Sequence, residues 1–313
     1  MATVAAETPD LRPLRIGEIL DVAIKVYTRN AGTLFRIVAI IIIPVQIVGV
    51  FIILSTFPDS LADASANPFI PDPNAPVPEI DFREIGIFFT AAMLVNILNF
   101  IGVTLATGAC FKAVTDAYLG ARSDWRTSMR FALRHLRSLL WITFLVALSS
   151  GLGLILCIAP GVWMWAAFAV ATPVLLTEGI KGTKAIGRSV NLVQKRWWNT
   201  FAVLLVAFAL AFILSSILGG LISALTFIDV GQNFVLVQSL NAVATALASI
   251  IATPFQAAVV AVLYFDLRVR KEGFDLQLLA QRMGTETPDG ARAALLPPPL
   301  PPALYGTPGA PPP

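Results

Sequence analysis

The 313-residue chain is far more apolar than a soluble domain, with 57% hydrophobic residues, 13% charged residues and a mean hydropathy of +0.78. Soluble domains carry about 25% charged residues and leave much of their surface in water, so a lipid environment fits this composition better. The two cysteines and one histidine exclude a disulfide framework, a CxxC redox pair and a multi-histidine metal site. We therefore expect no metal and no cofactor.

Apolar runs long enough to cross a bilayer occur six times along the chain. A helix needs about 20 apolar residues to span the hydrocarbon core. The runs of about this length are Ile37–Phe57, Ile85–Thr107, Leu139–Ile158, Val162–Thr177, Phe201–Phe227 and Val235–Phe265. The sequence thus predicts an all-α, polytopic membrane protein with six transmembrane helices.

The third and fourth spans share one apolar stretch, which is interrupted at Ala159-Pro160-Gly161. Proline presets φ and glycine tolerates positive φ, so these residues predict a tight hairpin turn. Because the fourth span is short, a second interpretation stays open, in which the pair re-enters without crossing. If the pair crosses, Cys157 lies near the outer end of the third span. Gly151 and Gly153 on that span are expected to permit close helix approach.

The placement of charge predicts the orientation of the chain. With a cytoplasmic amino terminus, the inside segments are 1–36, 108–138, 178–200 and 266–313, which hold 5, 6, 5 and 5 Lys and Arg residues. Only Arg83 lies elsewhere. The outer loops 58–84 and 228–234 carry acidic residues instead, namely Asp59, Asp63, Asp72, Glu79, Asp81, Glu84 and Asp229. This positive-inside distribution predicts a multi-pass plasma-membrane protein with both termini in the cytoplasm. It also explains the pI near 9.0 without a nucleic-acid partner.

Three cytoplasmic segments are amphipathic at helical spacing, and each leads into a span. Their apolar stripes are Ile16, Ile19, Leu20, Ala23, Ile24 and Tyr27; Trp125, Met129, Leu133, Leu136 and Leu140; and Ile186, Val190, Val193 and Trp197. Opposite charged faces are typical of helices in the membrane interface. We predict contact with lipid headgroups, and anionic lipids as partners, for six residues of these faces: Arg126, Arg130, Arg134, Arg137, Lys184 and Arg188. The recurring unit of one interface helix and two spans indicates either an internal triplication or convergence.

The domain organisation follows from these elements. Residues 1–36 form a cytoplasmic segment with an amphipathic helix, residues 37–266 the six-helix transmembrane domain, and residues 267–284 a cytoplasmic helix. Residues 285–313 are predicted to be a disordered tail, because a proline-rich stretch cannot build a core. The outer loop 58–84 is also rich in proline. The tail is interpreted as a spacer, with a docking peptide for a protein partner as the alternative.

Polar side chains within the spans mark a candidate path through the membrane. These are Asn96 and Asn99 on the second span and Asn241 and Gln256 on the sixth. Intramembrane amides either line a path for a substrate or join packed helices through hydrogen bonds of about 0.6 kcal/mol. The second interpretation is favoured.

Ionisable residues gather at the predicted cytoplasmic ends of the spans. Lys112 and Asp116 lie four residues apart, which predicts an ion pair on one helix face. Glu178, Asp266 and Arg268 close the fourth and sixth spans and are expected to be solvated anchors, with a cytoplasmic gate or a headgroup site as the alternatives.

Several local motifs resemble a known family. They are Leu14-Arg15-Ile16-Gly17-Glu18-Ile19-Leu20-Asp21, Tyr27-Thr28-Arg29-Asn30, Pro160-Gly161-Val162-Trp163, Pro173-Val174-Leu175-Leu176-Thr177-Glu178-Gly179, Arg188-Ser189, Arg196-Trp197-Trp198, Pro254-Phe255, Leu263-Tyr264-Phe265-Asp266-Leu267-Arg268-Val269-Arg270 and Glu272-Gly273. Over residues 11 to 283 the chain resembles the actinobacterial glycerophosphodiester phosphodiesterase membrane-domain family. The resemblance implies a membrane region alone, because the family's catalytic barrel uses histidines and metal-binding carboxylates, and this chain has one histidine.

These observations favour a non-enzymatic function. We expect an accessory or scaffold protein in envelope or lipid metabolism, with a transporter or channel for a small or amphiphilic molecule as the alternative. A catalytic group in the apolar core would be needed for an intramembrane enzyme, and no acid or base lies near the middle of any predicted span.

Overall fold

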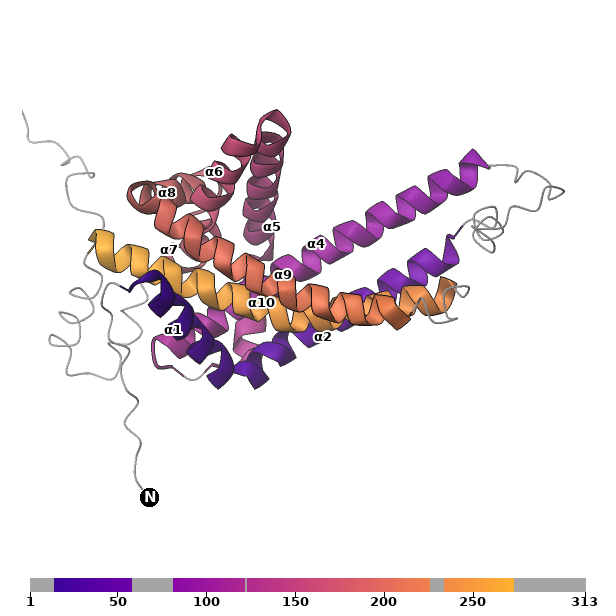
Figure 1. The fold of residues 1–313 in the computed structure, drawn as a ribbon, viewed down its shortest axis with the longest axis horizontal. Coiled ribbons are helices and arrows are strands. Elements are labelled where there is room, and N and C mark those ends of the chain that lie inside the picture. Colours follow the sequence, from indigo (N-terminus) through magenta and orange to yellow (C-terminus); the bar gives the residue numbers. More distant parts are fainter. Residues whose placement is uncertain (1–13, 58–80, 122, 226–233, 273–313) are drawn as a thin grey trace, which may run out of the picture.

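The computed structural model describes residues 14–57, 81–121, 123–225 and 234–272, and the regular structure within these ranges is helical (Figure 1). The helices are α1 (Ile16–Arg29), α2 (Ala31–Ser55), α4 (Phe82–Tyr118), α5 (Trp125–Leu156), α6 (Ile158–Phe168), α7 (Ala171–Glu178), α8 (Thr183–Val193), the short 3-10 helix η1 (Gln194–Arg196), α9 (Trp197–Leu225) and α10 (Phe234–Glu272). The predicted all-α fold is confirmed. Most of the predicted outer loop and the whole predicted tail lie outside the described residues.

Within the described residues, six stretches of helix are long and apolar enough to cross a membrane, which confirms the predicted multi-pass architecture. They are Ala31–Ser55, Phe82–Tyr118, Trp125–Leu156, Ile158–Glu178, Thr183–Gly220 and Phe234–Glu272. Helix α10 has 39 residues, so at 1.5 Å per residue it is about 58 Å long, roughly twice the thickness of the hydrocarbon core. Helices of this length must continue beyond the lipid tails into another part of the protein.

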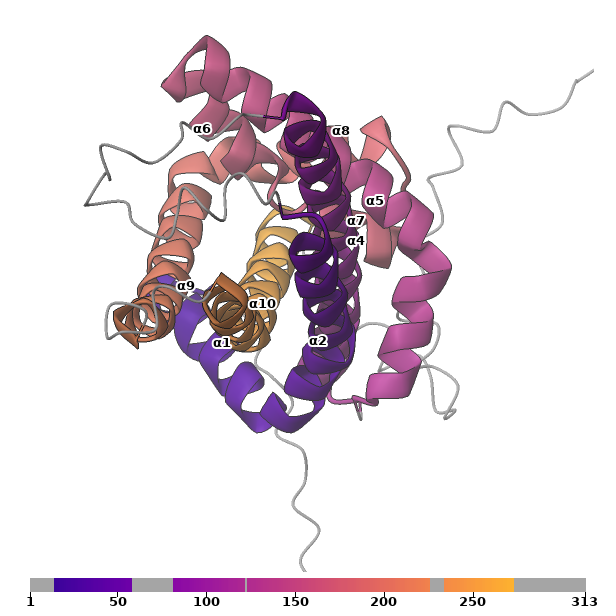
Figure 2. The ribbon, with the colours of Figure 1, turned by 90° about the vertical axis from the view of Figure 1, so that its right-hand side faces the viewer.

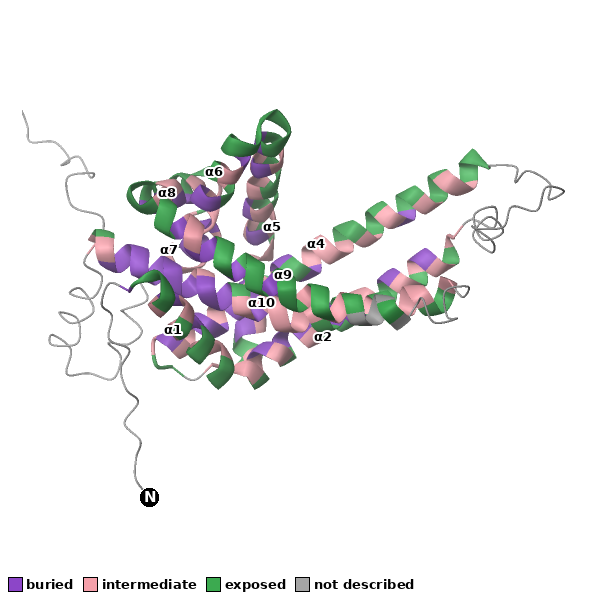
Figure 3. Cartoon of the chain, in the orientation of Figure 1, coloured by how far each residue is buried: buried purple, intermediate pink, exposed green. Residues whose placement is uncertain are grey.

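That part is a packed helical core at one end of the molecule, which we call the core end. It contains α1, α7, α8, the carboxyl-terminal halves of α4 and α10, and the adjoining ends of the other helices. Buried residues gather there, whereas the outer parts of α2, α4 and α9 are mostly exposed or half-buried (Figure 3). Exposed apolar side chains such as Phe51 and Met93 fit lipid contact.

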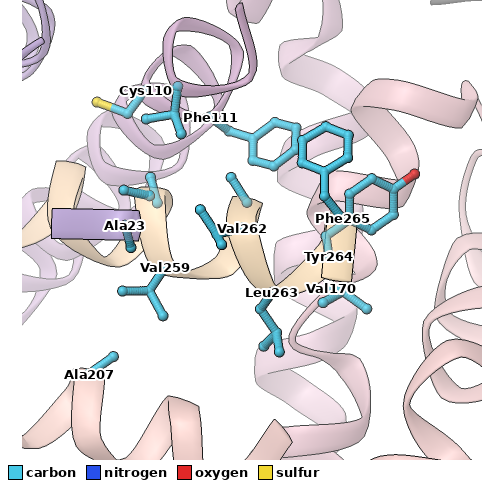
Figure 4. Packing of buried hydrophobic residues seen from close by; sticks show 14 of the residues in the cluster. Ala23, Cys110, Phe111, Val170, Ala207, Val259, Val262, Leu263, Tyr264 and Phe265 are labelled. Atoms are coloured by element: carbon cyan, nitrogen blue, oxygen red, sulfur yellow. The ribbon is translucent and has the colours of Figure 1, made fainter. Parts of the chain in front are cut away.

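The carboxyl-terminal half of α10 is the centre of the core end. Every residue from Ala257 to Val269 except Val260 is buried. The ring of Phe265 stacks on that of Tyr118, with ring centroids 5.2 Å apart. Phe111 of α4 and Tyr264 and Phe265 of α10 lie close together in the core (Figure 4). A helix that is buried on every side must be surrounded by neighbours, and α1, α2, α4, α7, α8 and α9 all contact α10.

The three predicted amphipathic segments have different structures. The first is a separate helix, α1, whose stripe residues Ile19 and Ala23 are buried in the core. The second is continuous with the third span in the single 32-residue helix α5. The third is α8 followed by η1, which leads directly into α9. Protein contacts therefore cover much of the stripe on α1.

Helices α5 and α6 form the predicted hairpin, but the turn lies at a different residue. The chain reverses at Cys157, which has extended backbone (φ −170°, ψ 145°), and not at Ala159-Pro160-Gly161. Pro160 lies in the first turn of α6. The N–H groups of a first turn have no partner within the helix, so the missing N–H of proline costs no hydrogen bond there. The hairpin leaves the core end in a direction different from that of α2, α4, α9 and α10 (Figures 1 and 2).

The predicted fourth span is not one continuous helix. It consists of α6 and α7, which are separated at Ala169 and Val170. Pro173 explains the break, because it has no N–H to donate to the carbonyl of Ala169 four residues earlier. The combined segment still has 21 residues and enough hydropathy to span a membrane.

Candidate functional site

A network of four charged side chains joins α7, α8 and α10 at the core end. Arg188 Nε donates to Glu178 Oε2 over 2.9 Å, and the same guanidinium pairs with Glu272. Arg268 Nε donates to Glu272 Oε2 over 3.1 Å and lies 3.9 Å from Glu178 Oε1. Among the described residues, two arginines thus face two glutamates.

The hydroxyl group of Tyr264 donates a further hydrogen bond to Glu178. This bond to Glu178 Oε1 is 2.9 Å long, and the hydroxyl groups of Tyr264 and Thr177 lie 2.6 Å apart. The side chains of Glu178 and Arg268 are only 8% and 9% exposed. The prediction that Glu178, Asp266 and Arg268 are solvated anchors is therefore wrong: Glu178 and Arg268 are buried where α7 and α8 pack against α10, and Asp266 is buried beneath the start of α1.

A second charged pair holds the start of α1 against α10. Asp266 accepts a hydrogen bond from the backbone N–H of Leu14 over 2.8 Å, and Arg270 Nη2 donates to the carbonyl oxygen of Leu14. The two side chains also bond each other, with Arg270 Nε 2.9 Å from Asp266 Oδ2. The backbone N–H and the backbone carbonyl of Leu14 both have hydrogen-bond partners on α10. These two bonds hold the start of α1 against α10.

A cavity of about 500 Å³ lies beside this second pair, between α1, the start of α9 and α10. Its polar lining is strongly basic, with three arginines and one aspartate. The lining residues are Leu14, Arg15, Ile16, Gly17, Ile19, Arg196, Asn199, Thr200, Leu263, Asp266, Leu267 and Arg270. We call this cavity the arginine cavity. The cavity is not evident from the sequence, although Arg196 precedes the interfacial pair Trp197-Trp198 and Arg15 precedes α1.

The six predicted headgroup residues fall into two groups. Arg126, Arg130, Arg134 and Arg137 are all exposed along the first half of α5, and the guanidinium of Arg126 lies 5.1 Å from the centre of the Trp125 ring. Lys184 is exposed at the start of α8. Arg188 instead forms ion pairs with the carboxylates of Glu178 and Glu272. We call the four arginines of α5 the arginine row.

The four residues of the candidate polar path do not meet. Asn99 accepts a hydrogen bond from Gln46 of α2 over 3.1 Å, which joins two packed helices. Asn96, Asn241 and Gln256 are exposed, and Asn96 donates to the carbonyl oxygen of Ala92 in its own helix. Two further cavities lie on and beside the outer part of α2, and none of the four residues lines these or the arginine cavity.

The predicted ion pair between Lys112 and Asp116 is confirmed on α4. Among the described residues, no three His, Cys, Asp or Glu side chains are grouped so that they could hold a metal ion. Comparisons with protein-family models, with curated proteins and with solved structures found no match.

Proposed function

We propose that this protein is a non-enzymatic scaffold of the plasma membrane that gathers anionic lipid at its basic surface and assists envelope or lipid metabolism. The observation that carries the proposal is the arginine row, in which all four side chains are exposed on the helix that continues into the third span. Basic residues beside an anionic leaflet contribute about 1 kcal/mol of attraction each.

The state of the buried charges favours a structural role over catalysis. General acid–base chemistry needs a carboxyl group that can exchange protons with a substrate. Glu178 and Asp266 are buried, and each bonds an arginine and a further donor within the protein. These groups hold helices together. The separation of Asn96, Asn99, Asn241 and Gln256 likewise favours the scaffold over the alternative of a transporter.

Replacing the four residues of the arginine row with glutamine is expected to reduce the enrichment of anionic lipid around the protein. The row contributes about 4 kcal/mol of attraction before salt screening, so a several-fold loss is expected. Lipids that copurify from mixed anionic and zwitterionic nanodiscs would be counted by native mass spectrometry. Four arginine-to-lysine changes keep the charge and serve as the control. Equal enrichment in all three proteins would show that the row serves only to orient the chain.

The proposed topology, with both termini cytoplasmic, makes a prediction for Cys157. This cysteine is exposed at the turn between α5 and α6, whereas Cys110 is buried. If α5 and α6 cross the membrane, a membrane-impermeant maleimide added to intact spheroplasts will label Cys157. The Cys157→Ser variant gives the background. Labelling that appears only after permeabilisation would contradict this topology and support a re-entrant pair.

A further inference from the structure

We infer that the arginine cavity is a discrete binding site for the phosphate group of an anionic lipid. This inference rests on the proposed function and gives it a specific ligand class. The site is separate from the arginine row, because its lining comes from α1, η1, α9 and α10 and includes no residue of α5.

The charges of the cavity are suited to a phosphate. Arg270 is paired with Asp266, whereas Arg15 and Arg196 are exposed residues of the lining, and no carboxylate within the described residues forms an ion pair with either of them. Three arginines against one aspartate leave a local excess of positive charge. Guanidinium groups bind phosphate oxygens in pairs of parallel hydrogen bonds, which is why arginine is frequent at phosphate sites.

A buried hydroxyl group adds a donor without a partner. The side chain of Thr200 is fully buried, lines the cavity, and makes no hydrogen bond within the described residues. Thr28, Thr90, Thr107, Thr177 and Thr245 each donate to the carbonyl four residues earlier in their helices. For Thr200 that carbonyl belongs to Arg196 in the 3-10 turn, where the helix geometry changes. Buried hydroxyl groups without partners are costly, so a ligand oxygen would stabilise this one.

The remaining lining indicates a lipid and not a free ion. Leu14, Ile16, Ile19, Leu263 and Leu267 form an apolar wall beside the arginines. Trp197 and Trp198 follow Arg196 directly, and Trp198 is largely exposed. Tryptophan is enriched at the level of lipid headgroups. A volume of about 500 Å³ is also within the usual range for sites of small ligands.

The test uses the full-length protein in zwitterionic nanodiscs, titrated with phosphatidic acid and followed by native mass spectrometry. We expect one saturable lipid on the wild-type protein, and at least tenfold weaker binding for the double variant Arg15→Gln/Arg196→Gln. Thr200→Val removes one hydroxyl group with little change in shape, and a roughly tenfold loss is expected from a hydrogen bond to a charged group. The control, Arg29→Gln/Arg36→Gln, removes two exposed arginines that belong neither to the cavity nor to the arginine row, and it should keep the saturable lipid.

The possible results separate this inference from the proposed function. The site is supported if the cavity variants lose the single saturable lipid but keep the general enrichment of anionic lipid. This result would support the site even if the variants of the arginine row showed no change in enrichment. Unchanged binding in both cavity variants overturns it. Displacement of the lipid by an equal concentration of inorganic phosphate would assign the cavity to free phosphate and refute the lipid. No saturable binding to the wild-type protein would also refute it, and would point to occupation by residues of the chain itself.

Discussion

Replacing Glu178 with alanine is expected to lower the free energy of unfolding by about 3–5 kcal/mol, the cost of removing one partner from a buried ion pair. Glu178 is 8% exposed and bonds both Arg188 and Tyr264. Without it, Arg188 loses an ion pair of 2.9 Å, and the buried guanidinium of Arg268 loses a carboxylate that lies 3.9 Å away. Since proteins are stable by only about 5–15 kcal/mol, the loss should be evident as a lower Tm in detergent.

The matched control for Glu178 is Asp21→Ala on α1. Asp21 pairs with Lys25 over 2.8 Å, but the two side chains are 60% and 63% exposed. A solvated pair of this kind contributes at most about 1 kcal/mol. The Tm of the control should therefore stay near that of the wild type. Equal shifts for both variants would contradict a structural role for the four-residue network and would reopen Glu178 as a functional group.

The spans were predictable from sequence because the requirement for them is local. Every backbone group in lipid must be satisfied within its own segment, so a run of about 20 apolar residues determines a helix without reference to the rest of the fold. The break between α6 and α7 also had a local signal, namely Pro173, whose missing N–H falls opposite Ala169. The predicted turn at Ala159-Pro160-Gly161 was wrong because proline is equally compatible with the first turn of a helix.

The core end was not predictable in the same way, because its contacts join distant parts of the chain. The bond between Arg188 and Glu272 spans 84 residues, and that between Arg270 and Leu14 spans 256. Hydropathy and periodicity contain no information on such pairs. Glu178 and Arg268 were therefore interpreted as solvated ends of spans, although the packing of α7 and α8 buries both.

The difference between local patterns and long-range contacts also explains why the arginine row was predictable from sequence and the arginine cavity was not. The arginine row follows a helical period along one segment, so the sequence was sufficient to identify its four members. The arginine cavity forms only when α1, η1 and α10 come together, and it brings Arg15 next to Arg270 from opposite ends of the described chain. The amphipathic pattern of α1 was correct, but the partner of its apolar stripe was found only in three dimensions.

Replacing Gly161 with alanine is expected to destabilise the α5–α6 hairpin by about 1–3 kcal/mol, the usual cost of overpacking. A Cβ atom at this position would lie 2.6 Å from the backbone nitrogen of Leu154 and 2.7 Å from its Cα. These are backbone atoms of the facing helix, so they cannot move aside as a flexible side chain would. Gly153 faces the same contact, since its Cβ would lie 2.9 Å from Cα of Gly161.

Gly151 provides a control with the opposite expected sign. It lies two residues from Gly153 on α5, and a Cβ atom there would meet nothing within 4 Å. Alanine favours a helix interior over glycine by up to about 1 kcal/mol, so Gly151→Ala should leave Tm unchanged or raise it slightly. Thermal unfolding of both variants in the same detergent compares the two effects directly. A Gly161→Ala variant as stable as Gly151→Ala would show that α5 and α6 are farther apart in the membrane, and the close crossing at Gly153 and Gly161 would then be wrong.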